Sequence, residues 1–401
     1  MTTNHRPGTT VSDLPPSRHH GIYILDPSKR CEPNAYLFTK TINFFLLNGY
    51  RITNDIHTCS TILVNSCCVS EDKIASSMGA LDLARPYAGQ KQVILLGCLA
   101  TLPTPRVNRE QLICIGPKEL DKLDALFPHM TAINDIPAHQ LHHELYEPGQ
   151  GLGRGDYFIL IAQGCNNSCS YCNIKRSKGS VSSEPVASIL SRLRQGLGLG
   201  VREFTLIADD CGSYGRDIGS DLVVLLRQIF ALAPDFTVKL LYLYPEYLLQ
   251  CFEEMAQLFG SGRISYVHLP VQSGSQRLLD LMNRSYPIEK VIENIRIIRN
   301  SGVQTTFCTH ILVNFPTETM ADFFASLELV KEFDEVIMLH YSDNLETAAA
   351  LIYPKVAPQE AEERLAIAAQ YVSRHKNGHG FVIKNFDCTL PYGLPARPSE
   401  A

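Results

Sequence analysis

Residues 157–172 read YFILIAQGCNNSCSYC, an apolar run followed directly by three closely spaced cysteines. The run has the length and composition of a buried β-strand. The thiolates of Cys165, Cys169 and Cys172 can hold one iron–sulfur cluster, but they supply only three of its four ligands. One iron is left open to another molecule, which is more typical of a catalytic site. A structural zinc site is the alternative, but no nearby Cys or His supplies the fourth tetrahedral ligand that zinc prefers.

Short apolar runs alternate with amphipathic segments on the C-terminal side of this loop. The expected strands are 157–162, 204–208, 238–244, 264–271, 305–315 and 336–341, and the expected helices are 184–195, 221–232, 246–259, 289–300 and 319–332. Alternating strands and helices indicate an α/β fold with a parallel sheet. A closed barrel of eight units usually takes about 250 residues, so this stretch predicts a partial (β/α)6 barrel.

Polar residues gather where the expected strands end. In parallel α/β folds the carboxyl ends of the strands build the active site. We therefore expect these ends to face the cysteine loop; they carry Cys165, Asp209-Asp210, Tyr244-Pro245, Gln272-Ser273-Gly274, Asn314 and Ser342.

A second α/β unit is expected on the N-terminal side of the barrel. Its apolar runs are at 22–25, 62–64 and 93–96, and its helical segments are at 35–48 and 119–127. Two of these runs lead directly to Cys67 and Cys98, and Cys31 follows the first. The three thiols are expected at one sheet edge, as a second three-thiolate site. Buried structural thiols are the alternative, since free Cys is often buried. Adjacent strand residues point to opposite faces, so only one of Cys67 and Cys68 can be a ligand.

The chain has 401 residues, 13 cysteines and a net charge of −5. This charge gives no general electrostatic case for a polyanionic partner. No apolar run approaches the roughly 20 residues of a membrane span, and the first 20 residues do not resemble a secretory signal. We expect a cytoplasmic protein whose cysteines serve metal ligation in a reducing compartment. The expected parts are a disordered lead-in 1–20, an N-terminal domain 21–147, a linker 148–155, a barrel 156–350 and a C-terminal helix and tail 351–401.

Several motifs together resemble the methylthiotransferase branch of the radical S-adenosylmethionine (radical SAM) enzymes. They occur in the family's order over roughly residues 20–375: Asn65-Ser66-Cys67, Gly97-Cys98-Leu99-Ala100, Gly164-Cys165-x3-Cys169-x2-Cys172, Ser213-Tyr214-Gly215-x-Asp217, His268-Leu269-Pro270-Val271-Gln272-Ser273-Gly274-Ser275, Met282-x-Arg284-x-Tyr286 and Asn314-Phe315-Pro316-x-Glu318-Thr319.

The resemblance implies two 4Fe–4S clusters and SAM as cofactors. Cys165, Cys169 and Cys172 would hold the cluster that reductively cleaves SAM, and the resulting 5′-deoxyadenosyl radical, rather than a catalytic side chain, would attack the substrate. Cys31, Cys67 and Cys98 would hold an auxiliary cluster carrying a methylated sulfur. Tyr171 is expected near the adenine of SAM, and the further expected SAM contacts are Asp209, Gln272, Ser273 and Asn314. A reductase or flavodoxin-type protein would supply electrons.

Departures from the family pattern concern the substrate. The family usually has Gln at position 209, Asp at 310 and Gly at 314 and 317, where this chain has Asp209, His310, Asn314 and Thr317. It also prefers Arg-Gly where this chain has Lys178-Gly179. Family members that modify tRNA or a ribosomal protein end in a small RNA-binding barrel, the TRAM domain. Such a barrel needs roughly 50 residues, and about 25 follow the last expected helix. We therefore expect a peptide or a small-molecule secondary metabolite as substrate.

Alternatives remain open at this point. The chain could be a tRNA (adenosine) methylthiotransferase whose RNA grip is supplied elsewhere, a radical SAM enzyme that inserts sulfur or relays electrons without methyl transfer, or an inactive iron–sulfur scaffold. Cys211 could contact substrate or pack in a core, and Asp209-Asp210 could cap a turn instead of binding SAM. His310 could move a proton or be a buried core histidine. The cluster His142-His143-Glu144 more closely resembles a solvated helix face than a metal site.

Overall fold

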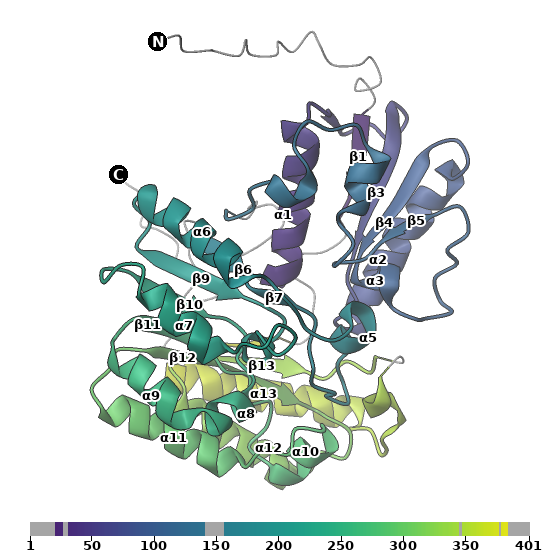
Figure 1. Ribbon diagram of the computed structural model, residues 1–401. Coiled ribbons are helices and arrows are strands. Elements are labelled where there is room, and N and C mark those ends of the chain that lie inside the picture. The colour runs from purple at the N-terminus through teal and green to yellow at the C-terminus, as the bar shows by residue number, and fades with distance from the viewer. Residues whose placement is uncertain (1–20, 27–30, 141–155, 345–346, 377, 384–401) are drawn as a thin grey trace, which may run out of the picture.

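The computed structural model describes residues 21–26, 31–140, 156–344, 347–376 and 378–383. The expected lead-in 1–20, the linker 148–155, His142-His143-Glu144 and the segment 384–401 lie outside the described residues. The described chain forms two parallel sheets with helices around them, as the sequence predicted (Figure 1).

The N-terminal sheet is entirely parallel, with strand order β2-β1-β3-β4-β5. Its strands are β1 (Gly21–Leu25), β2 (Ile52–Thr53), β3 (Cys59–Ser66), β4 (Gln92–Gly97) and β5 (Ile113–Ile115), and its helices are α1 (Glu32–Leu47), α2 (Glu71–Ala84), α3 (Cys98–Thr101) and α4 (Lys122–Leu126). Successive side chains of a strand face opposite sides. Leu63 accordingly packs with α1, whereas Ile62 and Val64 pack with α2 on the other face.

The larger sheet is also parallel, with strand order β14-β13-β12-β11-β10-β9-β6. Its strands are β6 (Tyr157–Leu160), β9 (Glu203–Ile207), β10 (Thr237–Leu240), β11 (Ile264–His268), β12 (Thr306–Val313), β13 (Glu335–His340) and β14 (Gly380–Ile383). A small antiparallel pair, β7 (Ala162–Gln163) and β8 (Ser182–Ser183), flanks the cysteine loop. The partial barrel is confirmed, and β14 extends it by a strand that the sequence did not predict.

Helices follow the strands of the larger sheet. They are α5 (Ile174–Lys178), α6 (Val186–Gly198), α7 (Leu222–Phe230), α8 (Pro245–Gln250), α9 (Phe252–Gly260), α10 (Gln276–Leu281), α11 (Ile288–Asn300), α12 (Met320–Glu328) and α13 (Pro358–Lys376). Alternate strand residues such as Ile159 and Leu206 pack in the core that these helices cover.

The two sheets share a hydrophobic core. Phe158, Ile207 and Tyr266, from three strands of the larger sheet, pack in one cluster with Phe38 and other residues of α1. Figure 1 shows α1 between the N-terminal sheet, in purple and blue, and the larger sheet, in teal to yellow. The N-terminal unit thus covers the inner face of the partial barrel and faces its strand ends.

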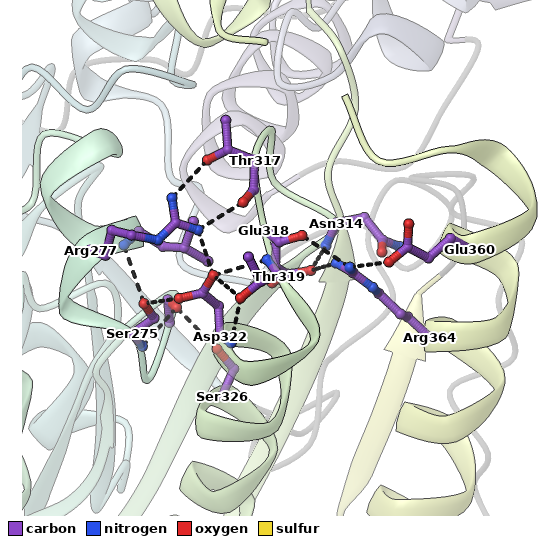
Figure 2. Close-up of polar contacts among 12 residues, drawn as sticks. Ser275, Arg277, Asn314, Thr317, Glu318, Thr319, Asp322, Ser326, Glu360 and Arg364 are labelled. Atoms are coloured by element: carbon purple, nitrogen blue, oxygen red, sulfur yellow. Dashed lines mark hydrogen bonds and ion pairs between the residues drawn. The ribbon is translucent and has the colours of Figure 1, made fainter. Parts of the chain in front are cut away.

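A buried ion pair ties α13 to the loop after β12 (Figure 2). Arg364 donates from Nη1 to Glu318 Oε2 at 2.8 Å, and their side chains are 2% and 0% exposed. The same carboxylate oxygen accepts the Asn314 N–H at 2.7 Å. Burial raises the pKa of Glu318 to about 7, although the Asn314 N–H and Arg364 both lower it.

We expect Arg364→Met to reduce the free energy of unfolding by about 3–5 kcal/mol near pH 8, because it leaves a buried carboxylate without its counter-charge. Loss of Arg364 raises the pKa of Glu318 further, so the folded state binds a proton that the unfolded state releases. The destabilisation should therefore shrink as the pH falls from about 8 to about 6. Chemical denaturation at both pH values measures this effect. In the control Arg364→Met/Glu318→Gln, the pH-dependent part should vanish; a loss independent of pH in both variants would contradict the account.

Candidate iron–sulfur site

The cysteine loop begins at Gly164, which has a left-handed φ of 81°. A Cβ at this position would lie 2.5 Å from the Ser180 carbonyl oxygen, so only glycine fits without a shift. Its N–H donates to Asp209 Oδ2 at 2.8 Å, and the next N–H, of Cys165, donates to the Gly179 carbonyl at 3.2 Å. The loop is thereby held at the carboxyl ends of β7 and β9.

Each of the three partly exposed thiols in this loop accepts a hydrogen bond. Cys165 Sγ accepts from Asn167, through N and through Nδ2, both at 3.4 Å. Cys172 Sγ accepts the Ile174 N–H at 3.4 Å, and Cys169 Sγ accepts from Arg284 Nη1 at 3.4 Å. Donors aimed at sulfur suit thiolate ligands and tune the potential of an iron–sulfur cluster.

Arg284, a residue of the sequence motif that had been given no role, lies beneath the loop. It is only 4% exposed, donates to the Pro270 carbonyl at 2.6 Å and contacts the Tyr171 hydroxyl at 3.4 Å. Its guanidinium also lies 4.3 Å from the ring centroid of Tyr244. A permanent positive charge is therefore fixed beside Cys169 and Tyr171, where it favours a negatively charged ligand set.

The other three predicted ligands come together from separate elements. Cys31 is the N-cap of α1, Cys67 follows β3, and Cys98 is the first residue of α3. Burial raises the pKa of the Cys31 thiol, and the thiols of Cys67 and Cys98 are near enough to raise it further. Asn34 donates from Nδ2 to Cys98 Sγ at 3.3 Å.

Cys68 lies in the same cluster of thiols. Its thiol hydrogen-bonds to Cys98, which lowers the pKa of Cys98 to about 6 and raises that of Cys68 well above its usual value. The thiols of Cys67 and Cys98 both raise the pKa of Cys31. This arrangement favours Cys67 as the third ligand, and the choice stays a prediction.

Both thiol sets fit iron–sulfur clusters better than single ions. In the described part of the chain, no three His, Cys, Asp or Glu side chains are arranged to bind one metal ion. The ligands of a 4Fe–4S cluster bind different irons, so their sulfurs are spread around the cluster. Each set offers three thiols for such a cluster, and the sulfurs of the three loop cysteines and of Cys98 accept hydrogen bonds.

Asp209 lies between the two thiol sets, and both of its carboxylate oxygens already have partners. Lys178 Nζ is 2.7 Å from Asp209 Oδ1, with side-chain exposures of 1% and 3%, and Oδ2 accepts the Gly164 N–H. Asp209 therefore fixes the start of the cysteine loop, and its predicted contact with SAM stays a prediction. Its neighbour Asp210 caps a turn through Gly212 N at 2.9 Å.

The remaining predicted SAM contacts occupy separate places. Gln272 lies four residues after β11, forms an isolated bridge with Ile311 of β12 and has a left-handed φ of 70°. The hydroxyl of Ser273 is fully buried, 3.0 Å from that of Ser326. The amide of Asn314 donates toward His340 Nδ1 at 3.0 Å and the Ala361 carbonyl at 3.3 Å (Figure 2 shows it beside Arg364). Their roles toward SAM stay predictions.

An inner group of aromatic side chains lies where the barrel meets α1, and sequence reasoning singled out only one of them, His310. The ring centroids of His268 and His310 are 4.1 Å apart, and Tyr242 lies 4.8 Å from His268. Tyr242 also donates its hydroxyl to Glu32, the residue after Cys31. Burial lowers the pKa of His310 to about 4, so this imidazole is neutral near pH 7. His268 Nε2 is buried without a hydrogen-bond partner, so this ring nitrogen is available for a further polar contact.

Cys211 belongs to the core. Its thiol is fully buried and donates to the Leu241 carbonyl at 2.9 Å, so the packing alternative holds. None of the helices in the described part of the chain combines the length and apolarity needed to cross a bilayer.

Comparisons with known proteins place the fold and the family. The sequence profile of the radical SAM superfamily matches residues 159–330. The radical SAM methyltransferase TsrM from Kitasatospora setae, solved with tryptophan and a SAM analogue, has a similar fold, with a TM-score of 0.59 over 92% of each chain at 13% identity.

Sequence relatives identify the family within the radical SAM superfamily. The chain is 31% identical to a probable threonylcarbamoyladenosine tRNA methylthiotransferase of Archaeoglobus fulgidus, over 76% of this chain and 73% of the relative. It is 28% identical to the tRNA-2-methylthio-N(6)-dimethylallyladenosine synthase of Syntrophobacter fumaroxidans, over 84% and 77%. The mouse threonylcarbamoyladenosine tRNA methylthiotransferase is 30% identical over 71% of this chain, which spans about half of that relative (51%). The chain belongs to the radical SAM methylthiotransferase family, whose superfamily membership implies a 4Fe–4S cluster and SAM.

Proposed function

We propose that this chain inserts a methylthio group at an unactivated C–H bond, and that its substrate is an adenosine of tRNA. The observation that carries the reaction class is the presence of two thiol sets at facing strand ends. Cys165, Cys169 and Cys172 form one set, and the second is Cys31, Cys67 and Cys98. The cluster and SAM, when bound, supply the radical chemistry.

The protein's own residues hold and orient these groups. Asn167, Ile174 and Arg284 donate to the loop sulfurs, and Gly164 and Asp209 fix where the loop starts. At the second set, α1 and α3 each begin at a ligand, so their N-terminal N–H groups add positive potential beside the sulfurs. The shared core between α1 and the barrel holds the N-terminal unit against the barrel.

The identity of the substrate is the finer part of the proposal. The curated relatives are named as tRNA methylthiotransferases, which favours tRNA over the peptide or small metabolite expected from the sequence. The short helix α5, directly after the cysteine loop, also presents exposed Lys175 and Arg176. Such cations can contact phosphates despite the acidic net charge. A reductase or flavodoxin-type donor remains the proposed electron source.

The experiment uses the full chain, reconstituted anaerobically and supplied with SAM, dithionite and tRNA from cells lacking methylthio modification. Mass spectrometry of digested nucleosides should show a methylthio-adenosine derivative. A thiol in place of the methylthio group would favour sulfur insertion without methyl transfer. If 5′-deoxyadenosine forms but the tRNA stays unchanged, the tRNA assignment is wrong. The substrate would then be sought by comparing extracts of producer cells with and without the gene.

Binding of tRNA gives an independent check. We expect Lys175→Ala/Arg176→Ala to weaken tRNA binding several-fold and to reduce the slope of log affinity against log salt by about 1–2, since each lost phosphate contact removes about 0.9 from the slope. The matched control Lys290→Ala/Lys331→Ala removes two exposed lysines of α11 and the turn after α12. Equal effects in both double variants would argue against a specific RNA face.

A further inference from the structure

The buried ion pair between Lys178 and Asp209 separates the two thiol sets. Its partners lie 2.7 Å apart and are almost fully enclosed, with side-chain exposures of 1% and 3%. Both positions depart from the family pattern, which has Arg before Gly179 and Gln at position 209. This chain therefore places a full negative charge, paired with lysine, where the family has a neutral amide.

The pair is linked to both sets through the backbone. Asp209 Oδ2 accepts the N–H of Gly164, which immediately precedes the ligand Cys165. On the other side, Ser177, the neighbour of Lys178, donates its hydroxyl to the carbonyl of Cys98 at 2.7 Å. Helix α5 thereby joins α3, and the two charges cannot move independently of either set.

The pair also has a direction. Lys178 follows Ser177, whose hydroxyl donates to the carbonyl of Cys98 at 2.7 Å, so the positive charge lies on the side of the N-terminal set. Asp209 lies on the side of the cysteine loop, because its Oδ2 accepts the N–H of Gly164, directly before Cys165, at 2.8 Å. The positive end thus faces the N-terminal set, and the negative end faces the cysteine loop.

Stability alone does not explain such a pair. Replacing a buried ion pair by apolar side chains of similar volume is often neutral or stabilising, because desolvation offsets the attraction of the charges. A charge held in a low-dielectric interior, by contrast, acts strongly on its neighbours. Adding an electron to a cluster adds negative charge, which a nearby cation favours and a nearby anion opposes.

We propose that Lys178 and Asp209 form a fixed dipole that sets the two cluster potentials apart. Lys178 raises the reduction potential of the cluster at Cys31, Cys67 and Cys98, and Asp209 lowers that of the cluster at Cys165, Cys169 and Cys172. The cluster at the cysteine loop becomes the stronger reductant, as SAM cleavage requires, while the cluster at the N-terminal set better stabilises an anionic sulfur group. This inference rests on the proposed function, since it requires both clusters.

The test is a dithionite titration of the reconstituted full chain, followed by electron paramagnetic resonance. Addition of SAM identifies the signal of the SAM-binding cluster. Asp209→Gln, which restores the family residue, should raise both potentials, and Lys178→Met should lower both. The double variant Lys178→Met/Asp209→Gln should lower the N-terminal potential and raise the loop potential. Each shift should change the reduction equilibrium about tenfold, or about 59 mV for one electron.

The control is Lys239→Met. Lys239, on β10, is another buried lysine, paired with Glu203 at 2.7 Å and with Asp156. It should leave both potentials unchanged. A double variant with wild-type potentials, or with two shifts of the same sign, would overturn the proposal. If that variant binds no iron, Asp209→Gln decides alone: no rise in the loop potential refutes the dipole. Iron for only one cluster in the wild type would instead refute the proposed function.

Discussion

Replacement of Cys165, Cys169 and Cys172 by alanine should remove about half of the iron from the reconstituted protein and abolish formation of 5′-deoxyadenosine. The three thiols are the proposed iron ligands of the loop. Each sulfur accepts a hydrogen bond that suits an iron-bound thiolate. Without them SAM has no open iron to bind, so its cleavage should fall to the level of the buffer control. Iron and acid-labile sulfide analysis, with chromatography of the nucleoside product, measure both effects.

The matched control replaces three cysteines outside both sets, Cys59, Cys114 and Cys251, by alanine. Cys59 is buried at the start of β3, and the other two are partly exposed. Iron content and 5′-deoxyadenosine should stay at wild-type levels in this variant. Undiminished 5′-deoxyadenosine in the loop variant would refute the assignment of the radical chemistry to this loop.

The sequence predicted the parts of the fold that have strong local signals. All six apolar runs of the barrel correspond to strands, because a strand buried on both faces is a continuous apolar run. The elements that were missed are short or weakly patterned. Strand β14 has four residues at a sheet edge. Its place depends on pairing with β13, whose residues lie 44 positions earlier in the chain, as in Val336↔Gly380. Helix α2 is rich in small residues, so its apolar periodicity is weak.

The departures at positions 314 and 317 have a structural explanation. Both residues have left-handed backbone, with φ of 62° at Asn314 and 67° at Thr317. Glycine, the family residue at both positions, adopts this conformation freely, and Asn tolerates it better than most residues. Thr317 is β-branched and is held by Arg277, which donates to its hydroxyl and its carbonyl at 3.0 and 2.7 Å. The chain thus holds at both positions a backbone that glycine would adopt freely, with other side chains.

Of the candidate site, only the cysteine ligands could be predicted from the sequence. Spacing indicates the loop thiols, and strand ends indicate Cys67 and Cys98, because both follow from local sequence. The roles of Arg284 and of the Lys178–Asp209 pair depend on contacts across 115 and 31 positions of the chain. No local pattern encodes which charge faces which thiol, so these residues became visible only in the structure.

The second large effect is expected at the N-terminal set. A Cys31→Ala/Cys67→Ala/Cys98→Ala variant should also lose about half of the iron, but it should still form 5′-deoxyadenosine, because the loop set and its donors are intact. It should make no methylthio product from tRNA, since the sulfur-carrying site is gone. This separation of SAM cleavage from product formation distinguishes an auxiliary site from structural thiols, whose loss would disturb folding and both measurements together.

Single variants decide between the neighbouring cysteines. Cys67 completes the motif Asn65-Ser66-Cys67 and raises the pKa of Cys31, whereas Cys68 hydrogen-bonds to Cys98. Cys67→Ala should therefore lose the auxiliary iron, and Cys68→Ala should keep it with unchanged product yield. The reverse result would assign Cys68 as the ligand. If both single variants keep all iron, the N-terminal thiols are structural, and the methylthio proposal loses the site on which it depends.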